Sequence, residues 1–222
     1  MRIRWYGQSA FRLEGEKSVV IDPFGDFSER MASRGITWEY APVEMQSADL
    51  LLITHEHADH NAAERVEAEA TIRSTAGTFE SPVGEVVGVA SEHDGEAGTK
   101  RGPNTIFRFA LDGLRICHLG DFGQPALRPE QREAIGAVDV LFVPAGGGPT
   151  IGGAPAAALV RELAPRLVVP MHYRTEAIGF LEPADEFLAA LGMRTETLAG
   201  SELATEELLD GDSVVAMLAP PR

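Results

Sequence analysis

Three histidines and an aspartate lie within six residues of the chain, in the segment Thr54-His55-Glu56-His57-Ala58-Asp59-His60. Imidazole and carboxylate groups are the ligands that divalent transition metals prefer. Because alternate side chains of an extended segment point the same way, His55 and His57 can bind one ion. Asp59 and His60 are adjacent and point apart, so they can reach a second ion a few ångströms away. The segment therefore predicts a two-metal site.

Strand ends must position these ligands. The apolar residues 50–53 predict a strand over 49–54 that ends at the histidine segment. Three further candidates follow predicted strands in the same way: His93 after residues 84–90, Asp121 after 114–119 and His172 after 167–169. If these strand ends lie along one edge of the fold, the side chains converge on a shared cleft, which is where α/β proteins usually place ligand sites.

The order of the predicted elements indicates an α/β protein with two sheets. The first half is mostly strands, although residues 62–69 predict a short helix. In the second half strands alternate with helices predicted at 129–135, 156–163 and 184–191. Asp112-Gly113 is typical of a hairpin turn between two strands. This order favours two sheets with helices outside over a doubly wound parallel sheet.

Length, composition and charge bound the class of protein. With 222 residues and 44% hydrophobic content, the chain is expected to form a single domain over residues 1–222. No stretch approaches the ~18 consecutive apolar residues of a membrane span. The start of the chain lacks a signal-peptide pattern, and the lone Cys117 suits a reducing compartment, so a cytoplasmic location is expected. The formal net charge of −15 disfavours a nucleic-acid partner and leaves a small-molecule substrate. Assembly into a homo-oligomer is compatible with the sequence.

The set of motifs resembles a known family. The His-x-His-x-Asp-His string, a later lone histidine, a Gly-Asp pair after a strand and a late histidine resemble the metallo-β-lactamase superfamily. Further stretches resemble its branch of cytoplasmic metal-dependent hydrolases, which includes ascorbate-6-phosphate lactonase: residues 5–11, 20–24, 119–121 and 169–173. The resemblance runs from the first strand to about residue 191. One departure is Gln8, where many relatives have histidine.

The resemblance implies an αβ/βα sandwich of two mixed sheets packed face to face, with helices outside. It also implies that two divalent ions are bound by two ligand sets, with Asp121 bridging both ions. The first set is His55, His57 and His93, and the second is Asp59, His60 and His172. The nitrogen-rich ligands favour Zn²⁺, and the mixed His and carboxylate set also accepts Mn²⁺ or Fe²⁺.

The predicted chemistry is hydrolysis. Two ions ~3.5–4 Å apart hold a bridging water and lower its pKa towards ~7. Asp59 is close enough in such a site to take or return a proton, which makes it the candidate catalytic residue. The expected substrate is a small ester, lactone or phosphoester, with a lactone suggested by the resemblance. The alternatives are a phosphodiesterase acting on a small molecule and a non-catalytic metal-binding protein of the same fold.

Several residues near the motifs have more than one possible role. His118 is expected to be a hydrogen-bonded core histidine, because alternation places it on a sheet face. Asp22 either forms a turn or orients a ligand histidine. The glycine-rich loop 145–154 is a phosphate cradle, a mobile lid or an ordinary connection. Tyr173 and Arg174, just after the predicted ligand His172, are candidates for substrate contact, and Arg101 in an earlier loop is a candidate for contact with an anionic group.

Overall fold

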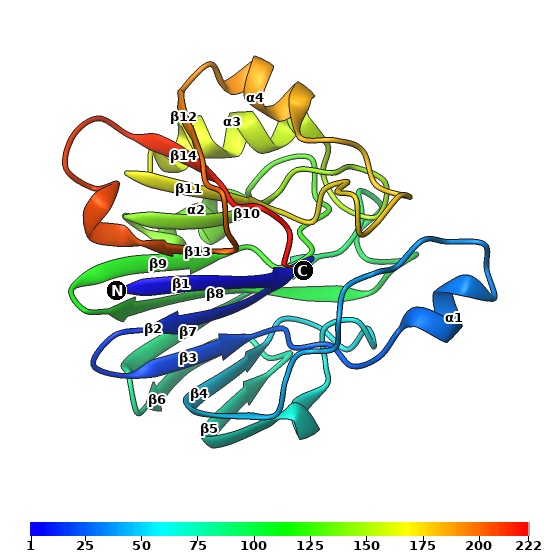
Figure 1. Cartoon of the computed structure of the whole chain (residues 1–222). Helices are drawn as coiled ribbons and strands as arrows, with labels where there is room; N and C mark the ends of the chain where they lie inside the picture. Colours follow the sequence, from blue (N-terminus) through cyan, green and yellow to red (C-terminus); the bar gives the residue numbers. More distant parts are fainter. Residues whose placement is uncertain (222) are drawn as a thin grey trace.

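Two β-sheets form the centre of the computed structural model, which describes residues 1–221 (Figure 1). The six-stranded sheet has the order β13-β1-β2-β3-β4-β5. Its strands are β1 (Arg2–Gly7), β2 (Ala10–Glu14), β3 (Ser18–Ile21), β4 (Gln46–Ile53), β5 (Val66–Arg73) and β13 (Glu202–Ala204). The eight-stranded sheet has the order β12-β14-β11-β10-β9-β8-β7-β6. Its strands are β6 (Gly77–Ser81), β7 (Gly84–Glu92), β8 (Pro103–Leu111), β9 (Leu114–His118), β10 (Val140–Pro144), β11 (Leu167–Met171), β12 (Arg194–Thr197) and β14 (Val214–Met217).

The inner faces of the two sheets share one apolar core. Buried side chains of both sheets belong to it, and the rings of Phe11 on β2 and Phe142 on β10 lie 4.6 Å apart between their centroids. Alternate residues of each strand point inward, so Ile3 and Trp5 of β1 join this core while Arg2 and Arg4, which alternate with them, do not. The burial of these faces is the main favourable contribution to the stability of the sandwich.

Helices cover the outer face of the eight-stranded sheet (Figure 1). Their bounds are α2 (Pro129–Ile135), α3 (Gly153–Leu163) and α4 (Asp185–Leu191). Leu159 and Val160 of α3 pack with Leu141 and Val168 of the sheet, and Phe187 of α4 joins the same cluster. The expected two-sheet α/β sandwich is therefore confirmed. Within residues 1–221, no helix is both long enough and apolar enough to cross a membrane.

The helix predicted over residues 62–69 is wrong. Ala63–Arg65 form one short 3₁₀ turn, and the residues from Val66 onward form β5. Alanine and glutamate favour helices, but β5 pairs in parallel with β4 from Gln46 to Ile53, and this pairing overrides the local preference. The exposure of β5 alternates along the strand, which is the period of a half-buried strand.

The connection between β3 and β4 holds a short helix that the sequence pattern did not predict, α1 (Ser28–Ala32). In Figure 1 it projects at the right of the sheets. Its buried Met31 and the rings of Phe24, Trp38 and Tyr40 belong to a separate apolar cluster. An isolated antiparallel bridge between Trp38 and Ile178 joins this connection to the segment after β11.

Six strands that precede candidate residues run in one direction. In the first sheet β3 and β4 are parallel, and in the second β9, β10 and β11 are parallel. β7 is antiparallel to β8, which is antiparallel to β9, so β7 runs with β9. The carboxyl ends of these strands emerge at the same edge, since the histidines that follow β4 of the first sheet and β7 of the second lie together. The two sheets meet there through a hydrogen bond from the Thr105 amide to the Thr54 carbonyl, 2.9 Å long.

Candidate metal centre

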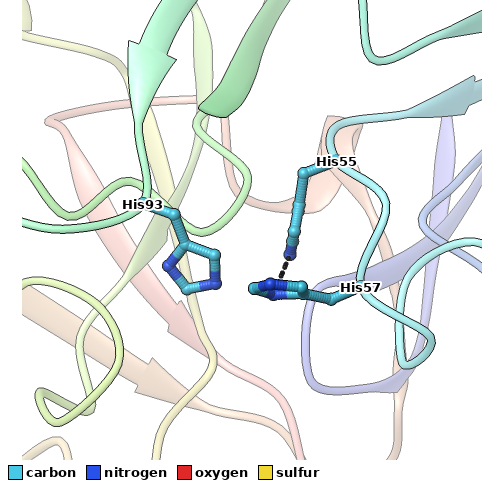
Figure 2. Close-up of side chains that lie close together, drawn as sticks. All are labelled: His55, His57 and His93. Atoms are coloured by element: carbon cyan, nitrogen blue, oxygen red, sulfur yellow. Dashed lines mark hydrogen bonds between the residues drawn. The ribbon is translucent and has the colours of Figure 1, made fainter. Parts of the chain in front are cut away.

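One group of three histidines converges at this edge (Figure 2). The ligand nitrogens of His55, His57 and His93 all lie within 4.8 Å of one another. Nε2 of His55 is 3.1 Å from Nδ1 of His57, as the dashed line in Figure 2 marks. His55 and His57 follow β4 of the first sheet, whereas His93 follows β7 of the second. The group therefore depends on the packing of the two sheets.

A second group lies beside the first and shares an oxygen with it. His60, Asp121 and His172 also place their ligand atoms within 4.8 Å of one another. Oδ2 of Asp121 lies 3.3 Å from Nε2 of both His60 and His172. The same oxygen lies 3.1 Å from Nε2 of His93, which belongs to the first group. Asp121 is thus placed between the two groups.

Asp59 lies at the margin of the second group. Its Oδ2 is 3.8 Å from Nε2 of His60, and its side chain is 23% exposed, against 3% for Asp121. The structure thus brings the seven predicted residues to one place, with six in two tight groups and Asp59 at their open side.

The donor atoms fit divalent metal ions. Nε2 of His60 is buried and makes no hydrogen bond within residues 1–221, although a buried polar atom without a partner is costly. A metal ion would satisfy it. Burial lowers the pKa values of His55, His57 and His172, which favours the neutral imidazole that binds metal.

The two charged ligands show opposite pKa shifts. Burial raises the pKa of Asp121, but the interactions of its carboxylate with His172 and His60 outweigh burial and hold it well below its usual range. Burial lowers the pKa of His60, but the charges of Asp121 and Asp59 raise it well above the usual value. A metal ion bound at His60 would have to displace the proton that these carboxylates attract.

Asp22 orients two of the histidines. Its Oδ2 lies 3.0 Å from Nδ1 of His60 and accepts a 2.7 Å hydrogen bond from the Thr54 hydroxyl. Because that hydroxyl donates to the carboxylate, it accepts from Nδ1 of His55, 3.0 Å away. Both rings consequently carry their proton on Nδ1 and present Nε2 to the centre. Of the two interpretations of Asp22, the structure supports the orienting one.

His93 is oriented from the glycine-rich loop. Its Nδ1 donates a 3.0 Å hydrogen bond to the carbonyl of Pro149, which leaves Nε2 to face Asp121. The loop is held by its own hydrogen bonds, among them the amide of Gly147 to the carbonyl of Ile151 at 3.1 Å. It contributes a carbonyl group that orients a ligand histidine of the centre.

Two glycines let the ligand loops approach closely. Gly120 has a φ of +58°, and a Cβ there would lie 2.4 Å from Oδ1 of Asn104 and 2.8 Å from Cβ of Thr54. A Cβ on Gly123 would lie 2.4 Å from the backbone between His93 and Asp94. Gly120, directly before Asp121, and Gly123, two residues after it, thus permit the close packing of the loop that carries this ligand.

His118 is a core histidine, as predicted. It is fully buried, its Nε2 donates to the carbonyl of Ser9 at 3.0 Å, and its Nδ1 accepts from the amide of Gly120 at 3.1 Å. Both ring nitrogens are therefore occupied. Ser9 in turn donates its hydroxyl to Oδ1 of Asp121, 3.0 Å away, and no spacing signal in the sequence pointed to this contact.

Of the three candidate contact residues, only one lines the cleft. Arg101 lines the cleft above the centre. Tyr173 is buried and donates its hydroxyl to the carbonyl of Leu218 at 3.4 Å, and Arg174 donates Nε to the carbonyl of Leu181 at 2.6 Å. Neither is among the residues that line the cleft. Gln8 is buried, and its amide atoms make no hydrogen bond within the described chain.

The cleft has a volume of about 510 Å³ and opens over both groups. Its lining includes His57, Asp59, His93, Asp121 and His172 of the centre. Four further lining residues lie in segments where the sequence gave no functional signal: Met31, Arg34, Ile36 and Phe180. A sandwich of two mixed sheets with a histidine-rich centre at one edge is the architecture of a metal-dependent hydrolase.

Comparison with known proteins agrees with that class. The pattern of the beta-lactamase superfamily domain matches residues 2–172. A UPF0173 metal-dependent hydrolase of Thermococcus kodakarensis is 31% identical over 89% of this chain and 95% of its own length. Another from Methylobacterium nodulans is 34% identical over 86% of this chain and 92% of its own length. A crystal structure of a metallo-β-lactamase superfamily protein from Thermotoga maritima is 32% identical, with a TM-score of 0.76 and 98% of both chains covered. The chain therefore belongs to the UPF0173 metal-dependent hydrolases of the metallo-β-lactamase superfamily.

Proposed function

We propose that the protein is a dinuclear hydrolase that cleaves a small ester, lactone or phosphoester. His55, His57 and His93 would hold one ion, Asp59, His60 and His172 would hold the other, and Asp121 would be available to both. The observation that carries this proposal is the position of Asp121 Oδ2, 3.1 Å from Nε2 of His93 and 3.3 Å from Nε2 of His60 and of His172. One carboxylate oxygen lies within reach of both ligand groups.

When bound, a pair of divalent ions supplies a hydroxide nucleophile at neutral pH and polarises the oxygen of the group that is attacked. Asp121 is fixed by Ser9 and buried, so it serves as a rigid ligand. Asp59 is partly exposed and lines the cleft, which lets it take the proton of the nucleophile and return it to the leaving group. Its role is therefore catalytic as well as ligating.

Zinc is the metal that the ligand set supports best. Five of the seven ligands are imidazoles, and the affinity of such sites for zinc exceeds that for manganese or iron. Mn²⁺ and Fe²⁺ are the alternatives, since the set also contains two carboxylates. Asp22 and Pro149 O orient the imidazoles whichever ion is bound.

The cleft supports a small-molecule substrate. A volume of about 510 Å³ suits a ligand of metabolite size. The formal net charge of −15 repels extended polyanions, which disfavours nucleic acids. A lactone is the narrower suggestion, and it rests on the likeness of the motifs to ascorbate-6-phosphate lactonase.

The test combines metal content with turnover. The purified protein is expected to bind two equivalents of zinc and to hydrolyse members of a panel of lactones, aryl esters and bis-aryl phosphodiesters. Removal of the metal by a chelator should abolish turnover, and added Zn²⁺ should restore it. Turnover confined to phosphodiesters would favour the phosphodiesterase alternative. Two tightly bound equivalents without turnover of any member would favour the non-catalytic metal-binding protein.

A further inference from the structure

Two arginines line the cleft from different segments of the chain. Arg34 follows α1, and Arg101 lies in the loop between β7 and β8. Both side chains are exposed, and within residues 1–221 neither guanidinium forms an ion pair or a hydrogen bond with another side chain. Many other arginines of this acidic chain pair with carboxylates, for example Arg73 with Glu56 and Arg115 with Asp139. Arg34 and Arg101 are thus left to face the cleft.

The loop that carries Arg101 is built around one carboxylate. Asp94, next to His93, accepts backbone hydrogen bonds from Glu96 and Gly98 on Oδ1, at 2.8 and 2.9 Å. On Oδ2 it accepts from the amides of Lys100 and Arg101, at 3.0 and 2.8 Å. Four donors on one buried carboxylate fix the path of the loop. The backbone of Arg101 is therefore held in place relative to His93 before any ligand binds.

Apolar residues form another part of the lining. Met31, Ile36 and Phe180 belong to it, and Phe180 is 42% exposed, as one of two exposed large apolar side chains within residues 1–221. The bridge between Trp38 and Ile178 brings the segments of Ile36 and Phe180 together. An exposed aromatic side chain at the mouth of a cleft indicates an apolar surface that a ligand can cover.

We propose that the substrate carries an oxyanion, a carboxylate or a phosphate, together with an apolar portion. Arg34 and Arg101 bind the oxyanion, and Met31, Ile36 and Phe180 contact the apolar portion. Guanidinium groups match the planar oxygens of carboxylates and phosphates with paired hydrogen bonds. The inference rests on the proposed function, since it assigns the substrate class of the same site.

The experiment measures how charge on a substrate changes its turnover. The anionic substrate is the 4-nitrophenyl monoester of glutarate, and its neutral counterpart is 4-nitrophenyl pentanoate, which has the same chain length. A third ester bears a phosphonate in place of the carboxylate and separates the two oxyanions. Zinc-loaded wild-type protein is compared with Arg34→Gln, Arg101→Gln and, as a control of equal charge, Arg2→Gln. Arg2 lies at the opposite end of β1 from the centre.

The ratio of kcat/KM for the anionic and neutral esters is the quantity of interest. We expect wild type to prefer the anionic ester and each cleft variant to lower the ratio about tenfold, mainly through KM, because a hydrogen bond to a charged group is lost. Arg2→Gln should leave the ratio unchanged. Equal ratios in all four proteins would overturn the inference while leaving the hydrolase intact.

A binding arm separates the two proposals. Calorimetry with the glutarate mono-propylamide, which lacks the scissile ester, reports oxyanion binding without turnover, and N-propylpentanamide is its neutral control. Arginine-dependent binding of the anionic amide, with no ester hydrolysed, would contradict the proposed function and support the oxyanion site. Hydrolysis of the esters, together with binding of the anionic amide that is equal in wild type and in both cleft variants, would support the proposed function and contradict the oxyanion site.

Discussion

The metal centre and the outer part of the cleft are built differently. The ligands of the centre follow strand ends, are mostly buried, and are oriented by further hydrogen bonds, such as that of Asp22 to His60. The outer part, with Met31, Arg34 and Phe180, lies on two connections that meet through the bridge of Trp38 with Ile178 and a hydrogen bond from the Glu39 amide to the Ala177 carbonyl. The comparison shows that the two packed sheets themselves position the candidate ligands. On the proposed function, substrate choice lies with these connections, which are outside the core between the two sheets.

The largest effect is expected where the centre is oriented. Asp22→Asn keeps the shape of the side chain but removes the charge that holds the proton on Nδ1 of His60 and, through Thr54, of His55. We expect a loss of about 10–100-fold in zinc affinity. Competition with a fluorescent zinc chelator measures it. Asp26→Asn, at an exposed aspartate before α1, is the control, and equal affinities for the two variants would contradict the orienting role.

The close approach at Gly120 is expected to cost stability. Gly120→Ala combines a positive φ with a contact of 2.4 Å to Oδ1 of Asn104. Gly192→Ala is matched to it, since its φ is +65° and nothing lies within 4 Å of its Cβ. We expect Gly120→Ala to lower the free energy of unfolding by about 2 kcal/mol more than Gly192→Ala. Urea denaturation of both variants measures the difference. Equal losses of stability would show that the close approach at position 120 does not require glycine.

A smaller effect is expected in the outer cleft. Phe180→Ala removes an exposed ring, so stability and metal content should stay unchanged. KM should rise about threefold to tenfold for esters with a long apolar chain and little for acetates, because about 1 kcal/mol of apolar contact is lost. Steady-state kinetics across chain lengths measure this. A change in metal content would mean that the two regions are not separate.

The smallest effect concerns the pair of the buried Asp139 and the exposed Arg115 side chain, outside both regions. Asp139 accepts two hydrogen bonds from the Arg115 side chain, which lowers the pKa of Asp139 in the folded protein. Its carboxylate therefore stabilises the fold above the unfolded pKa of about 4, and this stabilisation is lost as the pH falls through the lower folded value. In metal-free protein, Asp139→Asn should cost about 1 kcal/mol at pH 7 and progressively less below about pH 4. Urea midpoints at several pH values measure it, and a constant difference would contradict the assignment.

Local chemistry made much of the fold predictable. Asp112 and Gly113 both have positive φ, 50° and 77°, as the predicted two-residue hairpin turn requires. The histidine string and the strand-end positions of Asp121 and His172 led to the residues that the structure brings together. The hairpin turn and the candidate ligands could be predicted because residue type and spacing in the sequence are enough to identify them.

Other features depend on tertiary packing. Pairing with β4 decides that residues 66–69 form a strand, because their alanines and glutamates favour a helix while the alternation of apolar and polar residues favours a strand. Arg34 and Phe180 line the cleft because the bridge between Trp38 and Ile178 joins two distant connections. The contact of Ser9 with Asp121 spans the two sheets. Each of these follows from how the sheets and connections meet, and not from sequence spacing.

The number of metal ions held by two single variants tests the central claim most directly. Asp121→Ala removes the oxygen placed between both ligand groups, whereas His118→Ala removes a buried ring bonded only to Ser9 and Gly120. Atomic emission on zinc-loaded protein should show close to two ions in wild type and in His118→Ala, and fewer than two in Asp121→Ala. His118→Ala should instead lower the free energy of unfolding by about 2–4 kcal/mol. Loss of metal from His118→Ala together with full occupancy in Asp121→Ala would contradict the account.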